Sequence, residues 1–304
     1  MKVSIYVFLN KFVTLERNVV KMNILLCGNN KVFDGALTEL ISITNKTSEP
    51  VNCYIFTMDL TRIKPEYISI SDKQIKFLDD IVKRKNIQNS VKKIDVTNLY
   101  EQEFGNSKNE NAYCTPYTLL RLLADLVPEV PDKILYLDID MMASGDISKL
   151  YNIDISKYEY VAVKEKYGSV FLYPDYINAG MLLFNIKKIK ETGLLQKSRE
   201  LIRKRKLLFA DQSAIYFSTS TKLLVSRIYN EQSRFNRKGT VICHFCKRMW
   251  WFPYPHTVNY KQWNVEKIHS VYHCHTFDDD LNEYLKLSDE YRSLDDTNKV
   301  LLTT

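Results

Sequence analysis

Two aspartates two positions apart, Asp138 and Asp140, follow a short apolar segment, Lys133–Leu137, that is typical of a buried strand. Residues i and i+2 of an extended chain project to the same side, so both carboxylates can reach one point. Two carboxylates this close repel each other unless a cation lies between them. Carboxylate oxygens suit Mg²⁺ and Mn²⁺, which commonly join a protein to a phosphate-bearing substrate. The pair therefore predicts a metal-dependent chemical site.

Polar groups that could complete such a site occur in four later segments. They are the turn Asn178-Ala179-Gly180, the pair Asp211-Gln212, the pair Tyr229-Asn230 and the strand end at His244. Each is weak evidence alone, because Asp211 could simply cap a helix over 211–217, His244 could be a structural histidine, and 178–180 could be an ordinary turn.

The elements that must position these groups alternate between strands and helices in the first half of the chain. Strands are expected at 23–27, 51–57, 91–96 and 133–138, and helices at 34–44, 71–85 and 115–126, the first two capped by Asp34 and Ser71. This alternation predicts an α/β fold with a mostly parallel central sheet flanked by helices.

Ligands of parallel α/β sheets gather at the carboxyl ends of strands. The turn 28–31 and the aspartate pair both follow strands, so they are expected to face one crevice. Shorter strands are expected at 160–163, 181–184 and 241–244. Because no Pro/Gly/Ser linker divides the chain, we expect a single domain over 22–275, preceded by an extension over 1–21 and followed by a polar helical tail over 276–304.

The composition is that of an ordinary globular protein, with 304 residues of which 45% are hydrophobic and 26% charged. The apolar stretch 3–15 is interrupted by Asn10 and Lys11 and makes a poor signal peptide, and no run is long enough for a membrane-spanning helix. The six Cys lie mostly in apolar runs, which favours buried reduced thiols and a cytoplasmic protein. They are Cys27, Cys53, Cys114, Cys243, Cys246 and Cys274.

The net charge of +7 is concentrated in segment 221–275, which holds nine Lys and Arg and only two Glu. All three Trp, at 250, 251 and 263, lie there too. A basic aromatic segment suits an anionic ligand or peripheral contact with an anionic membrane at its inner face, and equally a core wall with a solvated basic rim. Nucleic acid is not expected, because no recognised binding module accompanies the patch.

Taken in order, the motifs resemble the family 8 glycosyltransferases, retaining enzymes that use a nucleotide-sugar donor. The resemblance covers residues 22–275 and is carried by ILYLDIDMMASGDISKLY, YINAGMLLFNIKKIK and ADQSAI. It implies the single-domain GT-A fold. It also implies that Asp138, Asp140 and His244 hold a divalent ion, Mn²⁺ or Mg²⁺, which grips the donor diphosphate.

The resemblance assigns the remaining residues to the donor. Gln212 would face the reacting sugar carbon, while Asn178 and Asp211 would bind sugar hydroxyls beside Ala179 and Gly180. The other donor contacts would come from Arg121, from the uridine-binding turn Cys27, Gly28, Asn29 and Asn30, and from Lys247 at the diphosphate.

Two departures from the family pattern concern the nucleotide. Asn29 and Asn30 replace acidic residues, and Val32 replaces the tyrosine that stacks on uracil. The loop after His244 lacks the usual glycine followed by Lys-Pro-Trp, so neither Lys247 nor Arg248 falls at the family spacing.

We therefore expect a hexosyltransferase that moves glucose or galactose from UDP-glucose or UDP-galactose to a glycan, glycolipid or glycoprotein. Two alternatives are a non-catalytic nucleotide-sugar binder and a haloacid dehalogenase-type phosphatase, which the residues Met141 and Met142 fit badly. A zinc site from Cys243, Cys246, His273 and His275 is a further alternative. Strand alternation opposes it, because it puts Cys243 on the face opposite Cys246.

Overall fold

The computed structural model describes residues 21–105, 107, 109, 115–207 and 209–303, with side chains up to residue 294. The predicted N-terminal extension, apart from Lys21, and Cys114 lie outside the described residues.

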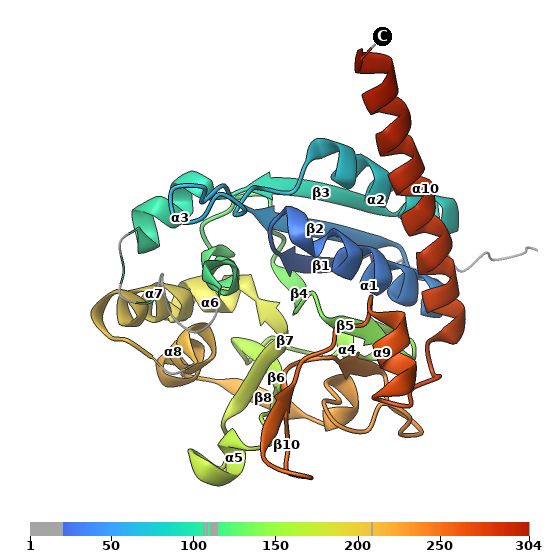
Figure 1. The fold of residues 1–304 in the computed structure, drawn as a ribbon. Coiled ribbons are helices and arrows are strands. Elements are labelled where there is room, and N and C mark those ends of the chain that lie inside the picture. Colours follow the sequence, from blue (N-terminus) through green and yellow to red (C-terminus); the bar gives the residue numbers. More distant parts are fainter. Residues whose placement is uncertain (1–20, 106, 108, 110–114, 208, 304) are drawn as a thin grey trace, which may run out of the picture.

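The first half of the chain forms the parallel part of the central sheet (Figure 1). Its strands, in spatial order, are β3 (Ser90–Asp95), β2 (Val51–Thr57), β1 (Met22–Cys27) and β4 (Lys133–Leu137). The connecting helices are α1 (Phe33–Lys46), α2 (Asp72–Lys85), α3 (Thr97–Phe104) and the 3₁₀ helices η1 (Asn30–Val32) and η2 (Pro116–Leu123). The predicted strand–helix alternation is confirmed.

The second half extends the same sheet beyond β4. Strand β7 (Ile177–Asn185) runs antiparallel to β4, and β6 (Tyr160–Lys164) and β8 (Lys222–Val225) follow it. Since β7 alone is reversed among these seven strands, the sheet is mostly parallel. The helices here are α4 (Ser148–Tyr151), α5 (Gly168–Phe171), α6 (Ile186–Thr192), α7 (Leu194–Lys204) and α8 (Ala210–Ser218).

Helices cover both faces of this sheet, and side-chain alternation along β1 shows the division. Ile24 and Leu26 pack into a core with α1 and α2, whereas Leu25 and Cys27 pack into a second core with η2, α7 and α8. The near-continuous apolar sequence of β1 follows from this two-sided burial.

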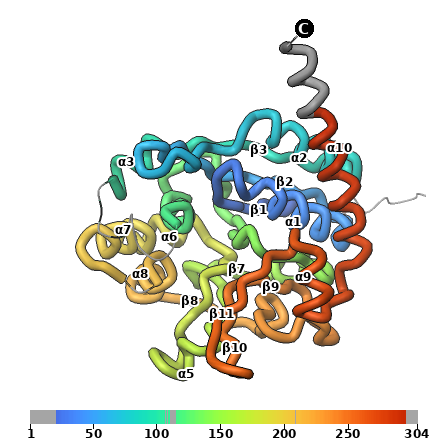
Figure 2. The backbone as a smooth tube through the Cα atoms, viewed as in Figure 1, coloured from blue at the N-terminus to red at the C-terminus, as the bar shows by residue number. Residues whose placement is uncertain are grey.

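The C-terminal segment crosses back over the first half (Figures 1 and 2). Two small sheets pair β5 (Met141–Ala143) with β9 (Ile242–His244) and β10 (Arg248–Trp250) with β11 (His256–Val258). The 3₁₀ helix η3 (Arg227–Tyr229) precedes them; α9 (Val265–Ser270) and α10 (Asp278–Thr303) follow. Helix α10 lies along α1, where Tyr284 donates a hydrogen bond to Asp34.

Three local predictions need correction. Asp34 lies inside the first turn of α1, because that helix continues directly from η1, whose cap is Asn29. Asp211 lies inside α8, where its carboxylate pairs with Arg121 instead of capping the helix. The helix expected over 115–126 is a 3₁₀ helix over Pro116–Leu123. The Ser71 cap is confirmed as a full capping box with Gln74.

No helix among the described residues is both long and apolar enough to cross a bilayer.

Candidate active site

The two aspartates and the histidine converge on one point, although they are far apart in sequence. Asp138 follows β4, Asp140 precedes β5, and His244 ends β9, where it pairs with Met141 across the small sheet. His244 Nε2 lies 3.0 Å from Asp140 Oδ1 and 3.6 Å from Asp138 Oδ2. We call Asp138, Asp140 and His244 the trio.

Two cations balance the carboxylates of the trio. The Arg121 guanidinium donates to Asp138 Oδ1 at 2.8 Å, and the Lys261 ammonium donates to Asp140 Oδ2. Burial alone would raise the pKa of the Asp140 carboxyl, but neighbouring His244 and Lys261 hold that pKa well below its usual range. Asp140 is therefore an anion at neutral pH.

Two hydrogen-bonded side-chain amides, Asn178 on β7 and Asn230 after η3, orient the His244 ring. Asn230 donates through Nδ2 to Asn178 Oδ1 at 2.8 Å, which leaves Asn230 Oδ1 to face His244 Nδ1 at 3.0 Å. In this amide assignment His244 Nδ1 donates to Asn230 Oδ1, and Nε2 faces the carboxylates. A ring held this way is typical of a metal-ligating histidine.

Gly180 makes the approach of His244 possible. A Cβ on Gly180 would lie 2.4 Å from His244 Cε1 and 2.8 Å from Nδ1. No side chain fits there, so the glycine is explained by the close passage of the imidazole.

The trio fits a hard divalent ion. Its three ligand atoms lie within 4.8 Å of one another, and two carboxylate oxygens with one neutral imidazole nitrogen form a donor set that Mn²⁺ and Mg²⁺ accept. A lone pair of Nε2 facing two anionic oxygens is repulsive unless a cation or a proton lies between them. Such a donor set is expected of a site that binds a metal ion as a Lewis acid.

The predicted sugar-side residues lie around Arg121. This buried guanidinium donates to the Ala179 carbonyl at 2.6 Å and pairs with Asp211 Oδ2 at 3.2 Å. Burial raises the pKa of Asp211, and Arg121 counteracts that rise. Gln212 Oε1 accepts from the Ala179 N–H at 3.0 Å, which fixes the orientation of its side-chain amide.

The predicted nucleotide-binding turn follows β1 directly. Cys27 ends the strand, and the Gly28 N–H donates to the Phe56 carbonyl at 3.0 Å. Asn29 uses its side-chain oxygen to cap η1, accepting from the Lys31 N–H. Asn30 Oδ1, in contrast, is buried with no hydrogen-bond partner among the described residues. An unpaired buried carbonyl is costly, so this oxygen is a candidate ligand-binding group.

Lys247 lies exposed in the loop after β9. Two residues that are hydrogen-bonded to the trio were given no role from the sequence. Lys261 contacts Asp140 and the Phe245 carbonyl, and Asn230 holds His244. The Tyr229-Asn230 pair was visible as a polar signal, whereas Lys261 was only one of nine cations in a basic segment.

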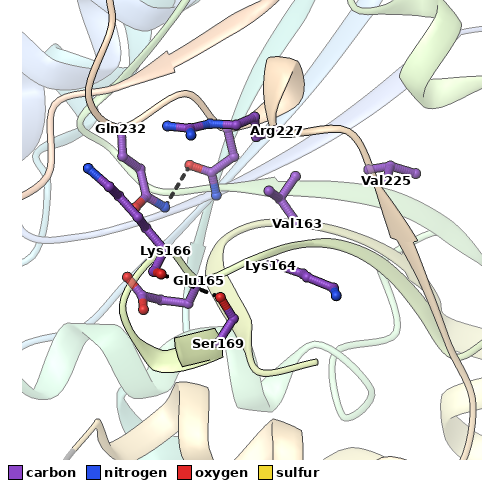
Figure 3. Close-up of a pocket in the computed structure, with 9 residues that line it drawn as sticks. Val163, Lys164, Glu165, Lys166, Ser169, Val225, Arg227 and Gln232 are labelled. Carbon is purple, nitrogen blue, oxygen red and sulfur yellow. Dashed lines mark hydrogen bonds between the residues drawn. The ribbon is translucent and has the colours of Figure 1, made fainter. Parts of the chain in front are cut away.

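A cavity of about 340 Å³ lies near β6 and α5 (Figure 3). Its walls come from β6, α5, the end of β8 and the loop after η3, and include Lys164, Lys166, Arg227 and Gln232. Asn230 lines it as well, so one residue borders both the cavity and the His244 ring.

The zinc alternative is not supported. Cys243 lies in a buried apolar cluster with its thiol donating to the Phe235 carbonyl, and within the described part of the chain neither potential metal-binding group contains a cysteine.

The sequence and the fold match known glycosyltransferases. Residues 23–250 match the model of glycosyl transferase family 8. Glycosyltransferase GlyF of Streptococcus pneumoniae is 25% identical over 260 residues, covering 82% of this chain and 59% of GlyF. A putative glycosyltransferase of Haemophilus influenzae is 24% identical over 188 residues, covering 58% of this chain and 52% of the relative. The chain thus spans little more than half the length of these two relatives.

Solved structures agree on the architecture. The galactosyltransferase LgtC, in complex with donor and acceptor sugar analogs, superposes with a TM-score of 0.64 at 15% identity, covering 88% of this chain and 96% of LgtC. GlyE of Streptococcus pneumoniae gives a TM-score of 0.58 at 18% identity, covering 88% and 64% of the two chains. The fold is GT-A, and the chain belongs to glycosyl transferase family 8.

Proposed function

We propose that this glycosyltransferase is a metal-dependent retaining enzyme that moves glucose or galactose from a UDP-sugar to a hydroxyl of a glycan, glycolipid or glycoprotein. The observation that carries the proposal is the convergence of Asp138, Asp140 and His244 within ligand distance of one another. Their surroundings contain the groups that a nucleotide-sugar donor needs.

The trio would hold Mn²⁺ or Mg²⁺, which stabilises the negative charge that develops on the departing diphosphate. The other residues act by position. Lys261, which is ion-paired with Asp140, would bring a positive charge to the diphosphate side, where the resemblance also places Lys247. Arg121 orients the carboxylates of Asp138 and Asp211 by bonding to both.

Gln212 and Asn178 suit the donor sugar. The Ala179 N–H uses one lone pair of Gln212 Oε1, and the second lone pair can face the sugar carbon, where positive charge develops as the glycosidic bond breaks. Asn178 and Asp211 offer polar groups to sugar hydroxyls, and buried contacts of this type discriminate strongly between epimers. Asn30 Oδ1 would accept the uracil N–H.

The cavity near β6 and α5 is our proposed acceptor site. It shares Asn230 with the His244 environment, so a hydroxyl entering it comes close to the reacting centre. The position of this cavity predicts that filling it slows transfer without weakening donor binding. Substituting Ser169, at its half-buried wall, with Phe should raise the acceptor KM and leave donor hydrolysis unchanged.

The hairpin of β10 and β11 is the surface that would contact the inner face of an anionic membrane. Such a membrane would present a glycolipid acceptor. Trp251, Phe252 and Tyr254 are exposed at its tip, and the segment around it is basic. Cosedimentation with phosphatidylglycerol vesicles should fall when Trp251 and Phe252 are both replaced by Ser. Equal recovery of wild type and variant would contradict this contact.

The test of the proposed activity is donor hydrolysis, because it needs no acceptor. Wild-type protein with Mn²⁺ should hydrolyse UDP-glucose or UDP-galactose in a panel of UDP- and GDP-sugars. Asp138→Asn or Asp140→Asn should reduce the rate about a thousandfold, because the ion that stabilises the leaving group is lost. The exposed Asp154→Asn variant is the matched control. Full activity in either site variant would refute the metal assignment, and UDP-sugar binding without turnover would favour a non-catalytic binder.

A further inference from the structure

A second group of potential metal ligands, separate from the trio, lies at the junction of α9 and α10 (Figure 1). His269 belongs to α9, His275 lies in the turn that follows, and Asp278 is the first residue of α10. We call these three residues the surface cluster. No part of the proposed transfer reaction uses it.

The geometry of the surface cluster is that of a ligand set. His269 Nε2 lies 2.9 Å from Asp278 Oδ1, and His275 Nδ1 lies 3.1 Å from Asp278 Oδ2. Two atoms that each ligate a tetrahedral Zn²⁺ at ~2.0–2.1 Å are about 3.4 Å apart. Together with the 4.8 Å within which all three ligand atoms lie, these distances allow coordination after small side-chain movements.

The two imidazoles are also arranged to act together. Their rings stack with centroids 4.8 Å apart and an interplanar angle of 16°. Two protonated rings so close would repel each other, whereas two neutral rings can each give a nitrogen lone pair to one ion. Both face the same carboxylate, so a shared cation would satisfy all three groups at once.

We propose that His269, His275 and Asp278 bind one borderline-soft divalent transition ion, with Zn²⁺ the best match. Two imidazoles and one carboxylate suit Zn²⁺ better than the oxygen-rich sites that Mg²⁺ and Mn²⁺ select. All three side chains are partly exposed, so the ion can enter from solvent and water can complete its coordination.

Binding would fasten the C-terminal segment. Helix α9 follows Gln262, which donates to the Ile139 carbonyl between the two aspartates, and α10 packs on α1. An ion joining α9 to α10 would therefore stabilise the segment that supports the active site, by favouring the folded state in which its ligands meet.

The test is Zn²⁺ titration of the metal-free full chain by calorimetry, with Cu²⁺ electron paramagnetic resonance as a second readout. The double variant His269→Gln/His275→Gln should take up one Zn²⁺ equivalent fewer than wild type, and Asp278→Asn should weaken that binding at least tenfold. Wild-type Cu²⁺ spectra should contain a species with two nitrogen ligands that the double variant lacks, since the trio offers only one nitrogen. His256→Gln, on β11, is the matched control.

Mn²⁺-dependent UDP binding checks that each variant is folded and tests the trio separately. Equal Zn²⁺ stoichiometry in wild type and the double variant would overturn the proposal and leave a plain His–Asp ion pair. Loss of the ion in His256→Gln instead would overturn it too. Neither result would bear on the proposed transferase activity.

Discussion

The trio and the surface cluster contain the same kinds of ligand but differ in everything around them. The trio joins three segments separated by up to 106 positions, whereas the surface cluster spans ten residues of one segment. Arg121, Lys261 and Asn230 each bond to one member of the trio, and these three contacts fix its geometry. Within the described part of the chain, the side chains of the surface cluster hydrogen-bond only to one another.

This difference teaches that a ligand set alone does not define a catalytic site. Pre-organised partners hold the trio near the carboxyl ends of β1 and β4, where donor-binding groups also converge. The surface cluster has no such groups beside it, which is why we assign it a structural ion. Four substitutions test this contrast.

The largest effect is expected from Gly180→Ala. Its new Cβ would collide with the His244 ring, so the imidazole must move and the trio loses a ligand. We expect a loss of Mn²⁺-dependent donor hydrolysis of about a hundredfold or more. Gly145→Ala is the matched control, because its Cβ would meet nothing nearer than 3.7 Å. Comparable rates in the two variants would argue against the role of close packing.

Asn230→Ala should have an intermediate effect. Removing the acceptor of the His244 Nδ1 proton leaves the ring free to turn, which typically weakens metal affinity about 10- to 100-fold. Asn230→Asp keeps an oxygen at this position and should restore most of the affinity. Mn²⁺ titration in the presence of UDP measures both, and failure of the aspartate to rescue would contradict the orienting role.

Glu39→Gln tests charge compensation beneath the trio. Burial, with a contribution from Asp140 and Asp138, holds the pKa of Glu39 well above its usual range, and neither carboxyl oxygen has a hydrogen-bond partner among the described residues. Above the ordinary carboxyl pKa of about 4.3 the unfolded chain releases this proton while the folded chain retains it. Wild-type stability should therefore fall relative to the variant as pH rises.

Urea unfolding of metal-free protein at pH 5 and pH 8 measures that difference. The stability gained by Glu39→Gln should be greater at pH 8, whereas the exposed Glu66→Gln control should show no such trend. A gain that is equal at both pH values would show that Glu39 is charged in the folded protein.

The smallest effect is expected from His275→Gln. Because the surface cluster does not touch the trio, the rate of donor hydrolysis with Mn²⁺ should equal that of wild type. A rate reduced by tenfold or more would mean that the two sites are coupled, and it would contradict the distinction between a catalytic and a structural site.

Much of this molecule could be predicted from local sequence. The strands of the first half and the helix cap at Ser71 could be predicted from apolar runs and turn residues, because period-2 and period-3.6 patterns reflect burial on one or two faces. The helix caps at Asp34 and Asp211 were placed wrongly, because α1 continues directly from η1 and the Asp211 carboxylate pairs with the distant Arg121.

The residues around the trio were predictable only in part. Asp138, Asp140 and His244 followed from motif order, but Lys261 lies 121 positions from the carboxylate it contacts and no local pattern marks it. Uridine selectivity and the acceptor are proposals that the donor panel and the cavity substitution test, and the role of Lys247 stays a prediction.

The sequence by itself determined which side chains end each strand, because backbone alternation sends alternate residues to opposite faces. Only the tertiary structure decided which of these ends meet, since the antiparallel pairing of β5 with β9 brings His244 to the aspartates. It also decided which cation accompanies each carboxylate. The physical reason is that charge compensation and close packing act through space, between residues whose separation along the chain carries no signal.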